Sequence, residues 1–439
     1  MLPEAARTSI LSRRWRHLFR FLSRINLDAS AHFNQKCKGE LGRKHLPLVS
    51  DSMLEAAKCM LAHDHLSVRL QPLEEFIDVI RCVDNAVVSG RRIASLWLIM
   101  SPENVDRDCI EEHWVTYGRC FMKFFDAAPH AFGGLTYLHI ECVGLSKDEM
   151  DNVLNTCNQL DYICLHECDC EGQSVLEIEH PRLTELKVTC CEFVTVVLRC
   201  FPKLRVLPCQ AWMTSQYRYP LSFGYVPQLS TLIISNPGPK KAKNFLLSEF
   251  LSNVMIDALS LDFQCEKIWI QLEDPKLVAP RLQNLHSLFL RRVHGECDLD
   301  WIMFFLEAAP LLKKLYVQVW DHTSCGDGED PRLQKLFDKR SNVLTWEARG
   351  NFKHYNLKEL TVVAYQDEKK FTTFIRHVVE AAVYLELIIL FDTNWCASCN
   401  FKPSTRFPRT DEERDWTRKQ ISQWRSKPID VRILNHITV

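Results

Sequence analysis

One short pattern recurs along most of this 439-residue chain and constrains its fold more than any other feature. The pattern is an apolar residue, two variable residues, Leu or Ile, one variable residue, and then Leu, Ile or Val. Its clearest copies are Leu135/Leu138/Ile140, Leu160/Ile163/Leu165, Leu183/Leu186/Val188, Leu229/Leu232/Ile234, Ile256/Leu259/Leu261, Leu285/Leu288/Leu290, Leu312/Leu315/Val317, Leu357/Leu360/Val362 and Leu385/Ile388/Leu390. Most copies start about 21–29 residues after the previous one, which is the period of leucine-rich repeats. The recurrence therefore predicts a repeat array.

Helical patterns occur between several of these short strands. Ser146 and Glu149 have the spacing of a capping box, and an apolar face follows from Met150 to Cys157. The segment Phe371–Ala382 repeats such a face between the last two copies of the pattern. Each repeat is thus expected to join a strand to a helix or to a looser return. We predict an α/β fold: a leucine-rich-repeat solenoid whose curved parallel sheet carries helices or irregular returns on its convex side.

Further strands are expected outside the main series. His65–Leu70 and Ile93–Leu98 alternate apolar and polar residues and are interpreted as irregular opening strands. Proline precedes several strands, as in Pro181-x-Leu183 and Pro310-x-Leu312, where it costs no ladder hydrogen bond. The loop Gln210–Tyr225 contains several aromatic residues, and we favour packing over partner binding for them.

Composition excludes some classes of partner and location. The chain has 55 acidic and 54 basic residues, so its net charge of −1 gives no reason to expect a nucleic-acid partner. The most apolar stretch, His377–Phe391, contains Glu380 and Glu386, and we expect no membrane-spanning helix. The 19 cysteines are scattered along a long chain and are expected to be reduced, which favours the cytoplasm or the nucleus.

The amino-terminal segment has a basic amphipathic pattern. Leu11, Trp15, Leu18 and Leu22 recur at helical spacing from about Thr8 to Ile25. Arginines interrupt any uncharged apolar core, which argues against a secretory signal, whereas a mitochondrial presequence stays an alternative.

The run Glu4–Phe19, with its Leu-Ser-Arg-Arg-Trp segment, followed by Ile25–Asp28, resembles the second half of a plant F-box. The first half of that motif would lie before Met1. The resemblance implies binding to a Skp1-like adaptor, with Leu11, Trp15 and Leu18 as the candidate contacts.

The carboxy-terminal region is similar to a second plant domain. Tyr355–Tyr365, the helical segment Phe371–Ala382 and Leu385–Leu390 resemble the domain called FBD, which closes many plant F-box/leucine-rich-repeat proteins. A capping box at Thr410 and Glu413 predicts a helix to about Arg425, and Val431, Ile433 and Ile437 then suggest a final strand.

These patterns predict four regions. They are a partial helical F-box at residues 1–28, a connector at 29–60, the leucine-rich-repeat solenoid at 61–350, and an FBD-like region at 351–439 that completes the solenoid.

No catalytic, cofactor or metal site is expected. Cys396-x-x-Cys399 has no second pair, and His63-Asp-His65 has no further ligand nearby, so ordinary surface residues are the preferred interpretation. Cys168 and Cys191 follow strands at the position where leucine-rich repeats carry Asn or Cys, and Cys190 is interpreted as an ordinary neighbour. The acidic stretch Asp321–Asp330 lacks the spacing of a calcium loop. The basic patch Pro237–Lys243 is interpreted as an exposed return.

Two functions remain open. The resemblance implies a non-catalytic substrate-recognition subunit of a Skp1–cullin–F-box ubiquitin ligase, which holds an unknown target protein on its repeat face. The alternative is a leucine-rich-repeat interaction scaffold that does not bind Skp1, because the first part of the F-box is missing. An enzyme with a site built from distant residues is the least favoured possibility.

Overall fold

The computed structural model of the chain describes the following residues: 25–28, 50–51, 53–55, 57–58, 65–70, 74–91, 95–100, 111–169, 175–210, 219–235, 245–264, 268–320, 346, 352–392, 406–425 and 427–435. The chain divides into two compact units. Unit 1 comprises residues 1–204 and 220–228, and unit 2 comprises residues 205–219 and 229–439.

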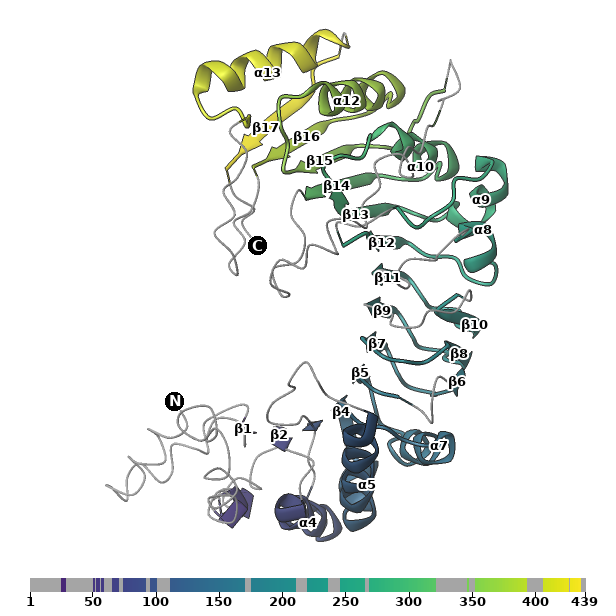
Figure 1. Cartoon of the computed structure of the whole chain (residues 1–439), viewed down its shortest axis with the longest axis vertical. Helices are drawn as coiled ribbons and strands as arrows, with labels where there is room; N and C mark the ends of the chain where they lie inside the picture. Colours follow the sequence, from purple (N-terminus) through teal and green to yellow (C-terminus); the bar gives the residue numbers. More distant parts are fainter. Residues whose placement is uncertain are drawn as a thin grey trace, which may run out of the picture. The chain divides into compact units, whose positions relative to one another are not determined.

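Unit 1 is built on parallel strands that follow one another in the sheet (Figure 1). Their order is β1 (Ile25–Asp28), β2 (His65–Leu70), β3 (Ser95–Met100), β4 (Leu135–Glu141), β5 (Tyr162–His166) and β7 (Glu185–Thr189). The helical segments of this unit include η2 (Glu74–Phe76), α4 (Ile77–Val88), α5 (Glu111–Ala127), α6 (Pro129–Gly133) and α7 (Lys147–Thr156). The first strand, β1, thus lies within the segment that we assigned to the partial F-box.

A second sheet belongs to unit 1 and was not predicted. It consists of β6 (Val175–Ile178), β8 (Thr195–Cys200) and β10 (Leu221–Tyr225), in the order β10-β8-β6 and all parallel. The prediction that Gln210–Tyr225 is a loop was therefore wrong for Gln210, which ends a strand of unit 2, and for its last five residues. These strands lie in the returns between repeats and lack the recurring aliphatic pattern. Local alternation alone marks them, as in Leu176 and Ile178, which are buried.

Unit 2 repeats the same construction. Its parallel strands are, in order, β9 (Val206–Gln210), β11 (Thr231–Ser235), β12 (Ala258–Asp262), β13 (Ser287–His294), β14 (Lys314–Trp320), β15 (Glu359–Val363), β16 (Leu387–Phe391) and β17 (Asp430–Leu434). The returns include α8 (Leu247–Phe250), α9 (Pro275–Leu282), η3 (Asp300–Ile302), α10 (Met303–Ala308), α12 (Lys369–Ala381) and α13 (Asp411–Gln423). The predicted α/β class with parallel strands and helical returns is confirmed.

The recurring aliphatic residues form the core, as predicted. Leu138 and Ile140 of β4 are fully buried, and so are Leu360 and Val362 of β15. Their neighbours in the sequence point to the other side of the strand because side chains alternate along an extended chain. The pattern therefore places one face of each sheet in the core and leaves the opposite face for other contacts.

The loop residues that precede successive strands are joined by a ladder of main-chain hydrogen bonds. In unit 2, the N–H of Asp257 donates to the Ser230 carbonyl at 2.8 Å, and that of His286 donates to the Asp257 carbonyl at 2.8 Å. The ladder continues through Lys313, Lys358 and Glu386 in the same way. Since these bonds involve main-chain atoms, the register of the strands does not depend on the side chains of the loops.

Both predicted capping boxes are present. Ser146 caps α7 and Thr410 caps α13, each with its Glu partner three residues later. The buried residues of α7 belong to the predicted apolar face, and so do those of α12 apart from Ala381. Helix α13 ends at Gln423, and the final strand β17 includes Val431 and Ile433 as predicted.

The last strand in the order, β17, is flanked by charged side chains. Arg418 of α13 donates its Nε hydrogen to the carbonyl of Val431 at 3.2 Å. Arg432 Nε lies 2.8 Å from Asp430 Oδ2 on the strand itself.

Several predictions fall outside the described residues. These are the adaptor contacts Leu11, Trp15 and Leu18, the pair Cys396 and Cys399, the segment His63–His65, the acidic stretch 321–330, the basic patch 237–243, and Ile437.

Helix α5 approaches the turn after β4 through a glycine. A Cβ atom added at Gly118 would lie 1.8 Å from the carbonyl oxygen of Gly144. The N–H of Gly144 in turn donates to the Trp114 carbonyl of α5 at 2.9 Å. Gly118 is therefore needed for close packing, although glycine is unfavourable inside a helix.

We predict that Gly118→Ala lowers the free energy of unfolding by about 3 kcal/mol, because α5 must move away from the turn. Gly133→Ala is the control, since its added Cβ would lie 3.7 Å from the nearest atom. Chemical denaturation followed by circular dichroism measures both. Equal stability of the two variants would contradict the close approach.

A buried histidine forms hydrogen bonds with the backbone of the loop that precedes β7. His180 Nε2 donates to the Cys157 carbonyl at 3.1 Å, and its Nδ1 accepts the N–H groups of Arg182 at 3.2 Å and Leu183 at 2.9 Å. Burial lowers the pKa of His180. The neutral ring, protonated at Nε2, is the form that satisfies all three contacts.

The same arrangement recurs at the entry to β15 in unit 2. His354 Nε2 donates to the Ala309 carbonyl at 3.0 Å, and its Nδ1 accepts the N–H groups of Asn356 at 3.3 Å and Leu357 at 3.0 Å. Burial lowers the pKa of His354 as well. In both cases the histidine precedes the first Leu of the repeat pattern by three residues.

We predict that these two histidines make stability depend on pH. The ordinary pKa is 6.5, so the unfolded chain takes up protons below that pH while the fold resists them. Stability should be complete above pH 6.5 and fall as the pH drops below it. In the double variant His180→Ala/His354→Ala, stability near pH 8 should be lower, by about 2 kcal/mol or more per site, because buried backbone groups lose their partners.

Urea denaturation of the parent and the double variant, measured from about pH 8 to pH 5, checks the pH dependence. The difference in stability between the two proteins should shrink as the pH falls. A constant difference would contradict the role assigned to the histidines.

Candidate functional site

The face of the unit 1 sheet opposite the core presents polar and aromatic side chains in register. We call it the open face of unit 1 and define it by the residues that alternate with the buried aliphatics on β4, β5 and β7. Along the paired strands it consists of Tyr137, Tyr162 and Glu185 in one row, His139, Cys164 and Lys187 in the next, and Glu141, His166 and Thr189 in the third.

The first row contains a stacked aromatic pair. The rings of Tyr137 and Tyr162 lie 4.4 Å apart between centroids and are inclined by 1°. Burial raises the pKa of Tyr162 above its ordinary value of 10. The pair offers a flat apolar surface with polar edges next to the histidines of the following rows.

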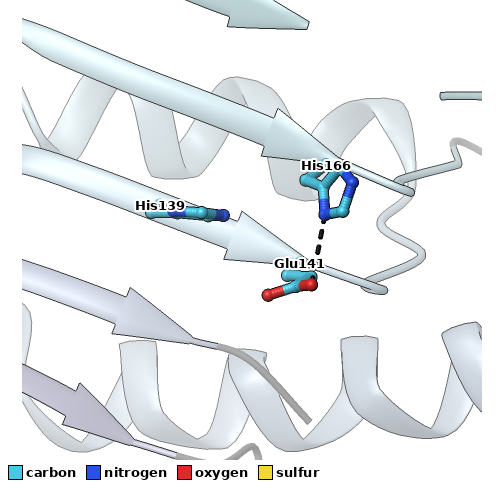
Figure 2. A group of neighbouring side chains, drawn as sticks. All are labelled: His139, Glu141 and His166. Carbon is cyan, nitrogen blue, oxygen red and sulfur yellow. Dashed lines mark hydrogen bonds and ion pairs between the residues drawn. The ribbon is translucent and has the colours of Figure 1, made fainter. Parts of the chain in front are cut away.

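Two histidines and a glutamate converge in the second and third rows (Figure 2). His139 and Glu141 are two residues apart on β4 and therefore share a face. His166 is the register partner of Glu141 on β5, and its Nδ1 lies 3.1 Å from Glu141 Oε1. One ligand atom from each of the three residues lies within 4.8 Å of the others.

His139 and His166 have different electrostatic environments. Burial lowers the pKa of His139, against the opposing effect of Glu141. A hydrogen bond with the Cys190 side chain and another with Glu141 raise the pKa of His166 to about 10. At neutral pH the cluster thus combines one neutral and one protonated imidazole with a carboxylate.

The buried Nε2 of His139 has no hydrogen-bond partner among the described residues. Buried polar atoms are usually satisfied, so this nitrogen, next to a carboxylate and a second imidazole, is available to a bound group.

Another group of residues lies just beyond the ends of these strands. Cys142, Glu167 and Cys190 come directly after β4, β5 and β7, and all three have a positive φ, of 55°, 51° and 54°. Glu167 accepts a hydrogen bond from Cys142 Sγ at 3.1 Å, and its Oε1 lies 3.9 Å from His166 Nε2. His166, Glu167 and Cys190 also offer ligand atoms within 4.8 Å of one another.

Sequence reasoning missed this cluster. His139, Glu141 and His166 occupy variable positions of the repeat pattern, and His166 is separated from the other two by a whole repeat. Cys190 was interpreted as an ordinary neighbour, whereas the structure brings it to His166. The signal that could have found the cluster was the register, because adding one repeat to position 141 gives position 166.

Cys168 and Cys191 have the structural role that was predicted. Cys168 Sγ donates to the Ile140 and His166 carbonyls at 3.6 and 3.4 Å, and Cys191 Sγ donates to the Leu165 and Thr189 carbonyls at 3.5 and 3.4 Å. Both are buried and satisfy backbone groups where the strands end. The described cysteines are free thiols.

The open face of unit 2, defined by the residues that alternate with the core on β12 to β16, has a different character. Phe289 of β13 and Tyr316 of β14 are register partners with ring centroids 5.8 Å apart. The guanidinium of Arg291 lies 5.7 Å from both centroids. The two rings are partly accessible and Arg291 is exposed, so this group is available to a partner.

Some of the aromatic residues in the segment 210–225 pack against the fold, as predicted, and one is exposed. In unit 2, Tyr219 contacts the rings of Phe245 and Phe250, and its hydroxyl donates to Glu249 at 2.8 Å. In unit 1, Phe223 is buried, whereas Tyr225 is 60% exposed. Trp212 and Tyr217 lie outside the described residues.

The family model described as "At1g61320/AtMIF1, LRR domain" matches residues 123–417 of the chain. The match covers more than half of the chain and agrees with the parallel strands of both units. The chain belongs to this LRR family. Its fold is thus a leucine-rich-repeat α/β solenoid, as the sequence pattern predicted.

The LRR match does not extend to residues 1–28, and it includes residues 351–417 within the repeat domain. Neither an F-box nor an FBD was detected. No curated protein matches the chain. Among the described helices, none has the length and apolar character needed to cross a membrane.

Proposed function

We propose that this LRR protein is a substrate-recognition subunit of a Skp1–cullin–F-box ubiquitin ligase. In this role the open faces bind a target protein, and the amino-terminal segment binds a Skp1-like adaptor. The chain would hold the target close to the other subunits of the ligase, which would carry out ubiquitin transfer.

The observation that best supports target binding is the group Phe289, Arg291 and Tyr316. Aromatic residues and arginine are the types that dominate the energy of protein interfaces. Here they lie together on neighbouring parallel strands. Phe289 is paired on both sides, with Ser260 and Tyr316, and Arg291 is paired with Asp262 of β12. A rigid backbone reduces the entropy that such side chains lose on binding.

The adaptor role is supported by the F-box resemblance of residues 4–28. An amphipathic helix with Leu11, Trp15 and Leu18 on one face would bind in an apolar groove, as helices do in many complexes. The alternative function is an LRR interaction scaffold outside any ligase, and it uses the same open faces without the adaptor.

We predict that the full chain binds purified Skp1 directly, and that Leu11→Ala/Trp15→Ala weakens binding at least about 10-fold because two apolar anchors are lost. Biolayer interferometry with immobilised Skp1 measures the affinity. Leu277→Ala is the matched control, since Leu277 is 63% exposed on α9. Absence of binding by the folded parent would favour the scaffold.

We predict that Phe289→Ala/Arg291→Glu removes target binding while the fold is retained, because both side chains are at least partly accessible. Proteins crosslinked to the full chain in a plant cell extract are quantified by mass spectrometry for the parent and the variant. The targets that depend on this face should fall at least about 10-fold. Leu277→Ala should retain them, and equal enrichment by all three proteins would contradict the assignment.

A further inference from the structure

We propose that His139, Glu141 and His166 on the open face of unit 1 bind a divalent transition-metal ion of the zinc type. This inference is independent of the ligase role, because it rests on the geometry of β4 and β5 alone.

The backbone places the three ligands before any metal arrives. Leu138 and Ile140 are fully buried, so His139 and Glu141 must project together from the opposite face of β4. The parallel register sets His166 beside Glu141, and the ligand atoms of the three residues lie within 4.8 Å of one another. Small side-chain rotations would bring them to the distances of about 2.0–2.2 Å that zinc requires.

The donor set selects the class of metal. Two imidazole nitrogens and a carboxylate oxygen suit zinc and its neighbours, whereas calcium and magnesium prefer oxygen ligands alone. Three protein ligands leave one tetrahedral position, which water or a group of a bound partner would fill.

The unpaired Nε2 of His139 is a second, independent observation. It is a buried nitrogen without a hydrogen-bond partner among the described residues, on the same face as a carboxylate and another imidazole. A metal ion would accept its lone pair and remove the cost of burying an unsatisfied polar atom.

Glu167 lies on the far side of the His166 ring, where metal-bound histidines commonly have a carboxylate. If His166 loses its Nδ1 proton on metal binding and uses that nitrogen as the ligand, its Nε2 faces Glu167 Oε1 at 3.9 Å, a distance longer than a hydrogen bond. A carboxylate on the far side of the ring fixes the tautomer and increases the basicity of the ligand. Cys142 holds Glu167 in place by its hydrogen bond of 3.1 Å.

The His166–Glu167–Cys190 group is the competing arrangement, and it would place the ion on the other side of the same imidazole. It lacks the second histidine and would use a thiolate. The two arrangements are distinguished by their ligands, because cobalt bound to a thiolate has an intense near-ultraviolet charge-transfer band that cobalt bound to nitrogen and oxygen lacks.

Metal binding by the full chain is measured by titration with Zn²⁺ against a chromogenic chelator, and by the visible absorption of Co²⁺. The background variant Cys396→Ser/Cys399→Ser removes the other pair with zinc-like spacing. We expect this variant to bind one ion at the proposed site, with no thiolate band. His139→Gln and Glu141→Gln should each weaken binding at least about 100-fold, because even outer partners contribute 10–100-fold.

His286→Gln is the matched control. His286 Nδ1 lies 2.5 Å from Asp257 Oδ1, so it forms a histidine–carboxylate pair, but the clusters found among the described residues do not include it. It should leave zinc affinity unchanged, whereas Glu167→Gln should weaken it about 10-fold. Circular dichroism and thermal unfolding without metal establish that each variant is folded.

Retention of full affinity in folded His139→Gln would overturn the proposal. A thiolate band that disappears in Cys190→Ser would overturn it as well, since the ion would then occupy the competing group. Binding that is lost in His139→Gln, Glu141→Gln and His166→Gln, and retained in Cys190→Ser, would support it.

Discussion

The burial of one aliphatic side chain in every second position of a strand is the interaction on which the rest of the structure depends. Leu138 and Ile140 in unit 1, and Leu288 and Leu290 in unit 2, are fully removed from water. Burial of each such side chain contributes about 1.5–3 kcal/mol, and a one-residue slip of a strand would expose the whole set. The core thereby fixes the register, and the register decides which side chains meet on the open faces.

This dependence explains which features could be predicted from the sequence. The strands with the full aliphatic pattern, the capping boxes of α7 and α13 and the apolar face of α12 were predictable because each is encoded within a short segment. The β6, β8 and β10 strands were not, since they lack the recurring aliphatic pattern and lie in returns whose length varies. Cys168 and Cys191 were correctly interpreted because their position relative to the strand is itself periodic.

The candidate site shows the limit of reasoning from one sequence. His139 and Glu141 could be recognised as neighbours on one face, but His166 joins them through the pairing of β4 with β5. The partner of a residue in a parallel sheet lies a whole repeat away, and the returns between repeats differ in length. Similarly, Phe289, Tyr316 and Arg291 form one group because Phe289 of β13 pairs with Tyr316 of β14. Local patterns predict strands, whereas the contacts across strands need the structure.

The charged surroundings of β17 have a consequence for how chains of this protein meet. An unprotected end of a parallel sheet exposes backbone groups that can pair with another strand and lead to aggregation. Here Arg418 already donates a hydrogen bond to the Val431 carbonyl. Asp430 and Arg432 place opposite charges along the same strand. A second molecule that added a strand beside β17 would have to remove the guanidinium and desolvate both charges, so β17, the last of the described strands in this sheet, is protected against edge-to-edge self-association.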